Sequence, residues 1–398
     1  MNKKISVGLA LFFAIVTAAA TFTLTMSFSK NMYNKLIAGL SERTAMNEAV
    51  NEIDGIIRDN YYGNIDEVKL NENIASGYVK GLGDNSSVYL TAKEYTQFKA
   101  RLSGKLPGIG VTAAYDSQAQ ALVITAVLPG SPALNAGLAR GDIIAAIGGK
   151  KVSQANAAQL LEELEGRKLT SVEITYSRGG IQNSVQVTRG YSAGTVTYEM
   201  LQGATGYIKI LAFYQNTAGQ LEDAISDLAK QGASVLLIDV RGTSLGDIDS
   251  AVAALDVLVP AATGGKPAAK AVDIKGRDIA TYATDSDEIA MPMVVLINAQ
   301  TAGAAELFAA DLKDFGKAQL IGAKTAGAGK MQRIFELRDG SAVRLSVGLI
   351  ITYSGKSFDR SCLVPDTEVP SLQDPALTPV GEDEQIQAAL GYFGRKAD

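Results

Sequence analysis

The chain has 398 residues, of which 47% are hydrophobic and 20% charged, a composition that predicts a folded protein of two to three domains. Its net charge is −5 and no basic cluster follows the first few residues, so we expect no nucleic-acid partner. Histidine is absent and Cys362 is the only cysteine. These counts exclude Ser-His and Cys-His catalysis, histidine-ligated metal centres and internal disulfides. We expect no metal or cofactor.

An uncharged run of 25 residues from Ile5 to Ser29 follows Lys3 and Lys4. As a helix it is long enough to cross a hydrocarbon core of about 30 Å. The lysines precede the run, so the positive-inside rule puts the N-terminus in the cytoplasm and the rest of the chain outside. We interpret residues 1–30 as a single-pass membrane anchor. A cleaved signal peptide is the alternative, because the alanines at 18–20 could form a cleavage site.

Residues 31–102 are predicted to form a helical stalk. Apolar residues recur at helical spacing after Glu42 and predict a helix that ends near Tyr61, their positions being Met46, Val50, Ile53 and Ile57. A second amphipathic helix is predicted from Leu70 to Leu82. Such apolar stripes are typical of packing faces, and we give them no other role.

Residues 103–189 consist of short β-rich runs, separated by Gly and Pro turns, around one helical stretch. They contain, in order, Leu106-Pro107-Gly108-Ile109-Gly110-Val111, Pro129-Gly130-Ser131-Pro132-Ala133, Ala136-Gly137-Leu138 and Gly141-Asp142-Ile143-Ile144. This succession resembles a PDZ domain of the bacterial protease type. The resemblance implies a loop whose backbone N–H groups hold a peptide carboxylate, and an edge strand that pairs with the peptide. We therefore expect polypeptide C-termini as partners, bound by Leu106, Gly108, Ile109, Gly110 and Val111.

Residues 190–398 alternate between strand-like and helical patterns, with strands expected at Thr205–Ile210, Val235–Val240 and Met293–Asn298. This alternation predicts an α/β core domain with a largely covered sheet. Together with the segments before it, this domain resembles the C-terminal processing peptidases, also called tail-specific serine proteases. The resemblance rests on fragments in the family's order: Leu82-Gly83-Asp84-Asn85-Ser86-Ser87-Val88-Tyr89-Leu90, the PDZ-like segment, Gly206-Tyr207-Ile208-Lys209-Ile210, Ile238-Asp239-Val240-Arg241, Val295-Leu296-Ile297-Asn298 and Val364-Pro365-Asp366.

The family resemblance implies a Ser/Lys dyad, in which a neutral lysine takes the proton from the attacking serine. In the family the serine is the middle one of Ser-Ala-Ser-Ala-Ser-Glu, and here Gly303 stands at its place within Thr301-Ala302-Gly303-Ala304-Ala305-Glu306. The family's Thr-Phe-Gly-Lys-Gly-Ser-Val-Gln corresponds to residues 325–332, which puts Ala328 at the lysine position and keeps Gln332. Gly303 and Ala328 are 25 residues apart, the family's own spacing. The sequence therefore predicts a core without the dyad.

The family's oxyanion turn, Asp-Leu-Arg-Asn-Asn-Pro-Gly-Gly, also differs here. The corresponding segment is 239–246, where Leu245 replaces the first glycine of the pair and Gly246 keeps the second. The nearest hydroxyl and amine to the empty positions belong to Thr301 and Lys330, so an active peptidase with a relocated dyad is the alternative to an inactive one.

Five other residues near these motifs have simpler interpretations. We expect Lys330 to be a solvated lysine, and Glu306 to be favoured by the helix dipole at the start of its helix, without a chemical role. At the end of a buried strand, Asp239 and Arg241 are expected to form a structural ion pair. Cys362 has no histidine partner and is expected to be buried packing.

We interpret the chain as a membrane-anchored, extracytoplasmic pseudoprotease that binds polypeptide C-termini, either to sequester them or to regulate an active homologous peptidase. Two alternatives stay open. One is the active peptidase that uses Thr301 and Lys330, and the other is a scaffold that binds no peptide.

Overall fold

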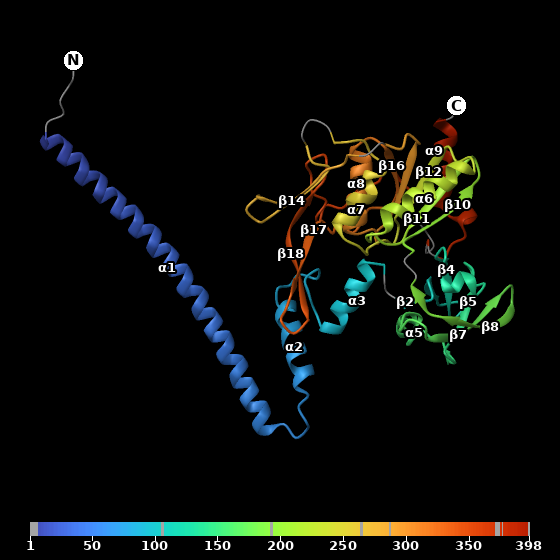
Figure 1. Cartoon of the computed structure of the whole chain (residues 1–398), viewed down its shortest axis with the longest axis horizontal. Helices are drawn as coiled ribbons and strands as arrows, with labels where there is room; N and C mark the ends of the chain where they lie inside the picture. Colours follow the sequence, from blue (N-terminus) through green and yellow to red (C-terminus); the bar gives the residue numbers. More distant parts are fainter. Residues whose placement is uncertain are drawn as a thin grey trace, which may run out of the picture. The chain divides into compact units, whose positions relative to one another are not determined.

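In the computed structural model the structure describes residues 7–104, 107–191, 194–262, 266–285, 288–370, 375 and 377–396. The chain forms two compact units, Met1–Asn71 and Glu72–Asp398. The first consists mainly of one long helix, α1 (Val7–Asn60), which runs without a break through residue 30, where we expected the anchor to end (Figure 1). Its stretch Phe12–Lys30 is long and apolar enough to cross a membrane.

A six-stranded sheet forms the centre of the core domain. Its first two strands are antiparallel and the others parallel, because most connections run through helices. In spatial order the strands are β10 (Val196–Leu201), β11 (Thr205–Ile210), β12 (Val235–Asp239), β15 (Met293–Ile297), β16 (Ala318–Gly322) and β19 (Thr367–Glu368).

Helices cover both faces of this sheet, as Figure 1 shows for the elements around β12. Alternate residues of β12 point to opposite faces, so Leu236 and Ile238 join one apolar cluster while Leu237 joins another. The first cluster also contains α6 (Thr217–Lys230), α7 (Ile248–Asp256) and α8 (Ala304–Asp314). The short helix η1 (Val380–Glu382) precedes α9 (Glu384–Lys396), which packs on the opposite face.

A second sheet of the core domain is antiparallel, and it draws one strand from the region expected to be a helical stalk. Strand β1 (Val88–Leu90) lies between α2 (Glu67–Lys80) and α3 (Ala92–Leu102) in the chain and pairs with β18. The other strands are β13 (Ala269–Val272), β14 (Asp278–Tyr282), β17 (Lys330–Glu336) and β18 (Ala342–Ile351). The segment before the PDZ-like region thus takes part in the core domain.

A small β-rich domain lies between α3 and β10 in the chain. Its sheet contains β3 (Val111–Asp116), β4 (Ala121–Val127), β5 (Ile143–Ile147), β6 (Lys150–Lys151), β7 (Ser171–Arg178) and β8 (Ile181–Thr188). Helices α4 (Pro132–Asn135) and α5 (Ala157–Leu164) pack on its own apolar core, and β2 (Pro107–Gly108) pairs with β9 (Gly190–Tyr191) beside it. The expected fold class, an α/β core with an inserted β-rich domain and an N-terminal apolar helix, is confirmed.

Candidate functional site

A sharp turn between strand β15 and helix α8 carries the position predicted for the nucleophile. Gly303 caps the helix with φ +62° and ψ −112°, a backbone conformation that residues with a side chain adopt only under strain. In hydrolases of another fold, a strained turn between a strand and a helix presents the catalytic serine. The chain therefore keeps a turn of this type without a side chain on it.

The structure brings Gly303 and Ala328 together. One carboxylate oxygen of Glu306, Oε2, accepts hydrogen bonds from the backbone N–H of Gly303 at 3.0 Å and of Ala328 at 2.7 Å. A Cβ atom added to Gly303 would lie 4.0 Å from the carbonyl oxygen of Ala328. The two positions that the sequence pairs by their spacing are thus neighbours in space; we call them the dyad positions.

Glu306 has a larger role than the sequence suggested. Its side chain is fully buried, and its other oxygen, Oε1, accepts from the Gly327 N–H at 2.7 Å and from the Thr325 hydroxyl. The helix dipole is therefore not the only interaction that stabilises this carboxylate, which joins the start of α8 to the loop at 325–328. A glutamate three residues after a helix cap can indicate that its side chain bonds back to the cap. The cap here is a glycine, so the usual Ser/Thr capping pattern is missing.

Thr301 and Lys330 make separate contacts. The Thr301 side chain is fully buried, where its hydroxyl donates to the Val240 carbonyl at 3.0 Å and accepts from the Asn298 N–H at 3.0 Å. The Lys330 ammonium forms an ion pair with Asp84 at 2.9 Å. The expectation that Lys330 is a solvated lysine is therefore wrong.

The pairing with Lys330 is one of several contacts of Asp84. Although burial raises its pKa, hydrogen bonds from surrounding donors, Lys330 among them, hold the pKa of Asp84 well below its usual range. The carboxylate of Asp84 therefore stays charged. Gln332, the retained family residue, lies half-buried on β17 just after a register shift in its pairing with β18.

Cys362, expected to be buried, is half-buried instead. It follows strand β18 in a tight turn, where its N–H donates to the Phe358 carbonyl at 3.1 Å and its own φ is +57°. This turn leaves part of the residue exposed.

The turn at Leu245 and Gly246 is held against Phe213. The Phe213 N–H donates to the Leu245 carbonyl at 2.9 Å, and the Asp247 N–H donates to the Phe213 carbonyl at 3.1 Å. Gly246 has φ +133°, and a Cβ there would lie 2.4 Å from the Phe213 oxygen, so only glycine fits. Leu245, in contrast, is 51% exposed.

A cavity of about 460 Å³ lies along the loop predicted to bind peptides; we call it the smaller cavity. Gly108, Ile109, Gly110 and Val111 all line it, whereas Leu106 lies outside the described residues. The Ile109 N–H donates to the carbonyl of the last residue of α5 at 3.2 Å. Val111 begins β3, which is the edge strand of its sheet. The four predicted residues are thus placed at one groove.

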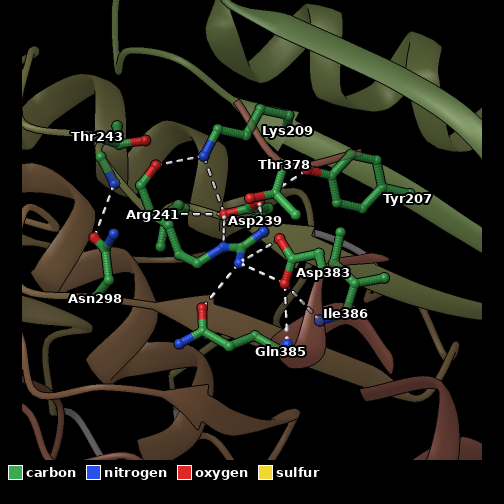
Figure 2. A network of polar contacts seen from close by, with 12 residues as sticks. Tyr207, Lys209, Asp239, Arg241, Thr243, Asn298, Thr378, Asp383, Gln385 and Ile386 are labelled. Carbon is green, nitrogen blue, oxygen red and sulfur yellow. Dashed lines mark hydrogen bonds and ion pairs between the residues drawn. The ribbon is translucent and has the colours of Figure 1, made fainter. Parts of the chain in front are cut away.

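A larger cavity of about 900 Å³ opens near the carboxyl ends of the parallel strands, the usual place for ligands in α/β sheets. Part of the polar network of Figure 2 lines this cavity, namely Tyr207, Lys209, Asp239, Arg241, Asn298 and Gln385. The Arg241 guanidinium pairs with Asp239 at 2.7 Å and with Asp383 at 2.8 Å, and it donates to Gln385 at 2.8 Å. The expected ion pair between Asp239 and Arg241 is confirmed.

Lys209 completes this network and balances its charge. Its ammonium contacts Asp239 at 3.0 Å, and the Tyr207 hydroxyl donates to the same carboxylate at 2.8 Å. Burial lowers the pKa of Lys209, and although burial raises that of Asp239, Lys209 and Arg241 hold it well below its usual range. Two cations thus face two carboxylates, Asp239 and Asp383, so the network joins β11 and β12 to the start of α9 and leaves no excess charge for a ligand.

Comparison with known protein families agrees with the organisation into a PDZ domain and an α/β core domain. The profile of peptidase family S41 matches residues 204–369, and that of the PDZ domain matches residues 123–176. A carboxy-terminal processing protease, CtpA, from Bacillus subtilis is 30% identical over 92% of this chain and 77% of its own length. A protein of Staphylococcus aureus described as a CtpA-like serine protease is 28% identical over 99% of this chain and 80% of its own length.

A solved structure from Bacteroides fragilis, described as an S41 protease, has the same fold. It superposes with a TM-score of 0.56, over 85% of this chain and 92% of its own, at 18% sequence identity. The chain therefore belongs to the C-terminal processing peptidase family and carries that family's PDZ domain.

Proposed function

We propose that the chain is a pseudoprotease of this family, which binds polypeptide C-termini in its PDZ domain and does not cleave them. The observation that carries the proposal is the pair of dyad positions, Gly303 and Ala328, side by side without a nucleophile or a base. Acyl transfer in this family needs both groups, because an unactivated hydroxyl is a weak nucleophile. The relatives are described as proteases, and those names concern the relatives themselves.

The contacts around the dyad positions support the same conclusion. Glu306 already occupies the backbone N–H groups of Gly303 and Ala328. The hydroxyl of Thr301 is bound to Val240, and the ammonium of Lys330 to Asp84. A dyad relocated to Thr301 and Lys330 would have to break both of these contacts before either group could react.

Tail binding is proposed from the geometry of the smaller cavity. An edge strand with a free side can pair with an extended peptide, and the glycine loop before it can hold the terminal carboxylate. A bound carboxylate would replace the Leu164 carbonyl as the acceptor of the Ile109 N–H. A charged carboxylate is a stronger acceptor than a neutral carbonyl, so this exchange favours the anionic end of a chain over an internal segment.

Replacing the terminal carboxylate of the peptide with an amide tests tail binding. We expect a labelled peptide with a free apolar C-terminus to bind the detergent-solubilised chain about 10- to 100-fold more tightly than the same peptide with a C-terminal amide, because charge-assisted hydrogen bonds are lost. Fluorescence anisotropy titration of the two peptides measures the ratio. Equal affinity for both would rule out this mode of binding.

Membrane anchoring is the second part of the proposal, and it rests on Phe12–Lys30, a helical stretch that is long and apolar enough to cross a membrane and whose side chains are exposed. The anchor places the PDZ and core domains on the extracytoplasmic side, as the positive-inside rule indicates for the lysines before it.

We expect the expressed chain to stay in the membrane pellet after a carbonate wash and to be released by detergent. Protease added to intact cells, after removal of the wall, should digest the PDZ domain. A soluble mature form that starts near residue 21 would show a cleaved signal peptide instead.

A further inference from the structure

The smaller cavity is formed by two domains rather than by the PDZ domain alone. On one side lie the loop and the edge strand, together with Leu161 and Leu164 of α5. On the other side lie Tyr214 and Leu245, which belong to the core domain. A tail bound in the groove would therefore meet side chains of the core domain.

Leu245 is held in a fixed position on this wall. Its backbone is tied to Phe213 on both sides of the turn, and the glycine that follows it fits only against the Phe213 backbone. A single exposed leucine is ordinary on a protein surface, so its exposed fraction of 51% is no argument alone. Leu245 differs from such residues because it lines the same cavity as residues 108–111, the loop expected to bind the peptide carboxylate.

The lining of the smaller cavity is mainly apolar, with one ion pair, Arg101 with Glu165 at 3.1 Å, among its residues. Leu161 and Leu164 of α5 supply aliphatic surface, and Tyr214 also lines the cavity. Burial raises the pKa of Tyr214 to about 12, so this phenol is neutral at physiological pH and does not repel a carboxylate.

We propose that Leu245 is a specificity-determining residue that contacts apolar side chains at the end of a bound tail. This inference rests on the proposed function, since it needs a tail in the groove. In the family, the corresponding turn contributes backbone N–H groups to the oxyanion hole. Leucine replaces glycine here at position 245, and the proposal assigns a binding role to its side chain. The tails selected are those that end in apolar side chains.

A double-mutant cycle between protein and peptide tests the role of Leu245. Against a labelled free-acid peptide ending in Leu-Leu, Leu245→Ala in the full chain should weaken binding about 5- to 30-fold, because roughly half to all of a leucine contact is lost. Against the same peptide ending in Ala-Ala, the loss should be less than about twofold. The matched control is Leu134→Ala, since Leu134 is 48% exposed on α4 outside the cavity, and it should leave both affinities unchanged.

The outcomes separate the two proposals. If the wild-type chain binds the free-acid Leu-Leu peptide and Leu245→Ala binds that peptide as tightly as the wild type does, the role of Leu245 is wrong and tail binding stands. If the wild-type chain binds neither peptide, both proposals are wrong. A thermal melt of each variant checks the fold, which an exposed leucine is not expected to affect.

Discussion

Replacing Glu306 by Gln should lower the free energy of unfolding by about 3 to 5 kcal/mol. The buried carboxylate accepts from the N–H groups of Gly303, Gly327 and Ala328 and from the Thr325 hydroxyl. An amide keeps one acceptor oxygen and turns an NH₂ group toward the other donors, which strands about two of them at roughly 1–3 kcal/mol each. Urea denaturation at pH 7 measures the loss.

The same helix provides a matched control in Asp311, which is also fully buried. Its Oδ1 accepts from the Tyr353 N–H at 2.8 Å, and among the described residues its Oδ2 has no hydrogen-bond partner. Burial raises the pKa of Asp311 well above its usual range. Its contribution to stability is therefore complete below the unfolded-state pKa of about 3.9 and is lost as the pH rises toward the folded-state value.

Asp311→Asn should consequently gain stability relative to the wild type between pH 5 and pH 8, by up to about 1.4 kcal/mol per pH unit until the folded-state pKa is passed. Glu306→Gln should stay destabilised throughout this range. Equal effects of the two substitutions would show that the hydrogen bonds from the four donors to Glu306 do not hold the turn at Gly303 and the loop at 325–328 together.

Repair of the dyad should restore activity only in combination. Gly303→Ser alone should give no turnover, because the hydroxyl lacks a base, and φ +62° at this residue adds about 1–3 kcal/mol of strain. Gly303→Ser with Ala328→Lys should recover a trace of hydrolysis, since the two positions are neighbours. Adding Leu245→Gly should raise kcat further if the oxyanion turn is the third defect, whereas loss of the leucine contact should weaken peptide binding and so raise KM.

Turnover of a labelled tail peptide by each purified variant, measured by mass spectrometry over a day, gives the order of recovery. Removal of a catalytic unit in a serine protease lowers kcat by about 10⁶, so even partial repair is detectable above the wild type. Activity of Gly303→Ser alone, equal to that of the double variant, would show that another residue serves as the base.

Local patterns in the sequence predicted the core strands well. The strand expected at Thr205–Ile210 has these bounds in the structure, and the runs that begin at Val235 and Met293 are buried strands that differ by one residue at their ends. Continuous apolar runs between helical stripes are a strong signal, because a parallel sheet covered on both faces needs them. The spacing of 25 residues likewise predicted that Gly303 and Ala328 belong to one site.

Contacts between distant segments could not be predicted in this way. Lys330 pairs with a carboxylate 246 residues earlier in the chain, and Glu306 accepts from a loop about 20 residues later. Neither partner follows from the residues around it, so the sequence predicts a solvated Lys330 where the structure has an ion pair. The same holds for Leu245, whose position on the wall of the PDZ groove depends on how two domains meet.

The most direct test of the account is to measure binding and hydrolysis of one tail peptide in the same sample. The wild-type chain in detergent is mixed with a labelled free-acid peptide, anisotropy gives the bound fraction, and mass spectrometry gives the intact fraction after a day. The account predicts that the peptide is bound and remains intact at the level of a blank. Turnover by the wild-type chain, abolished by Thr301→Val or Lys330→Ala, would contradict it and establish a relocated dyad.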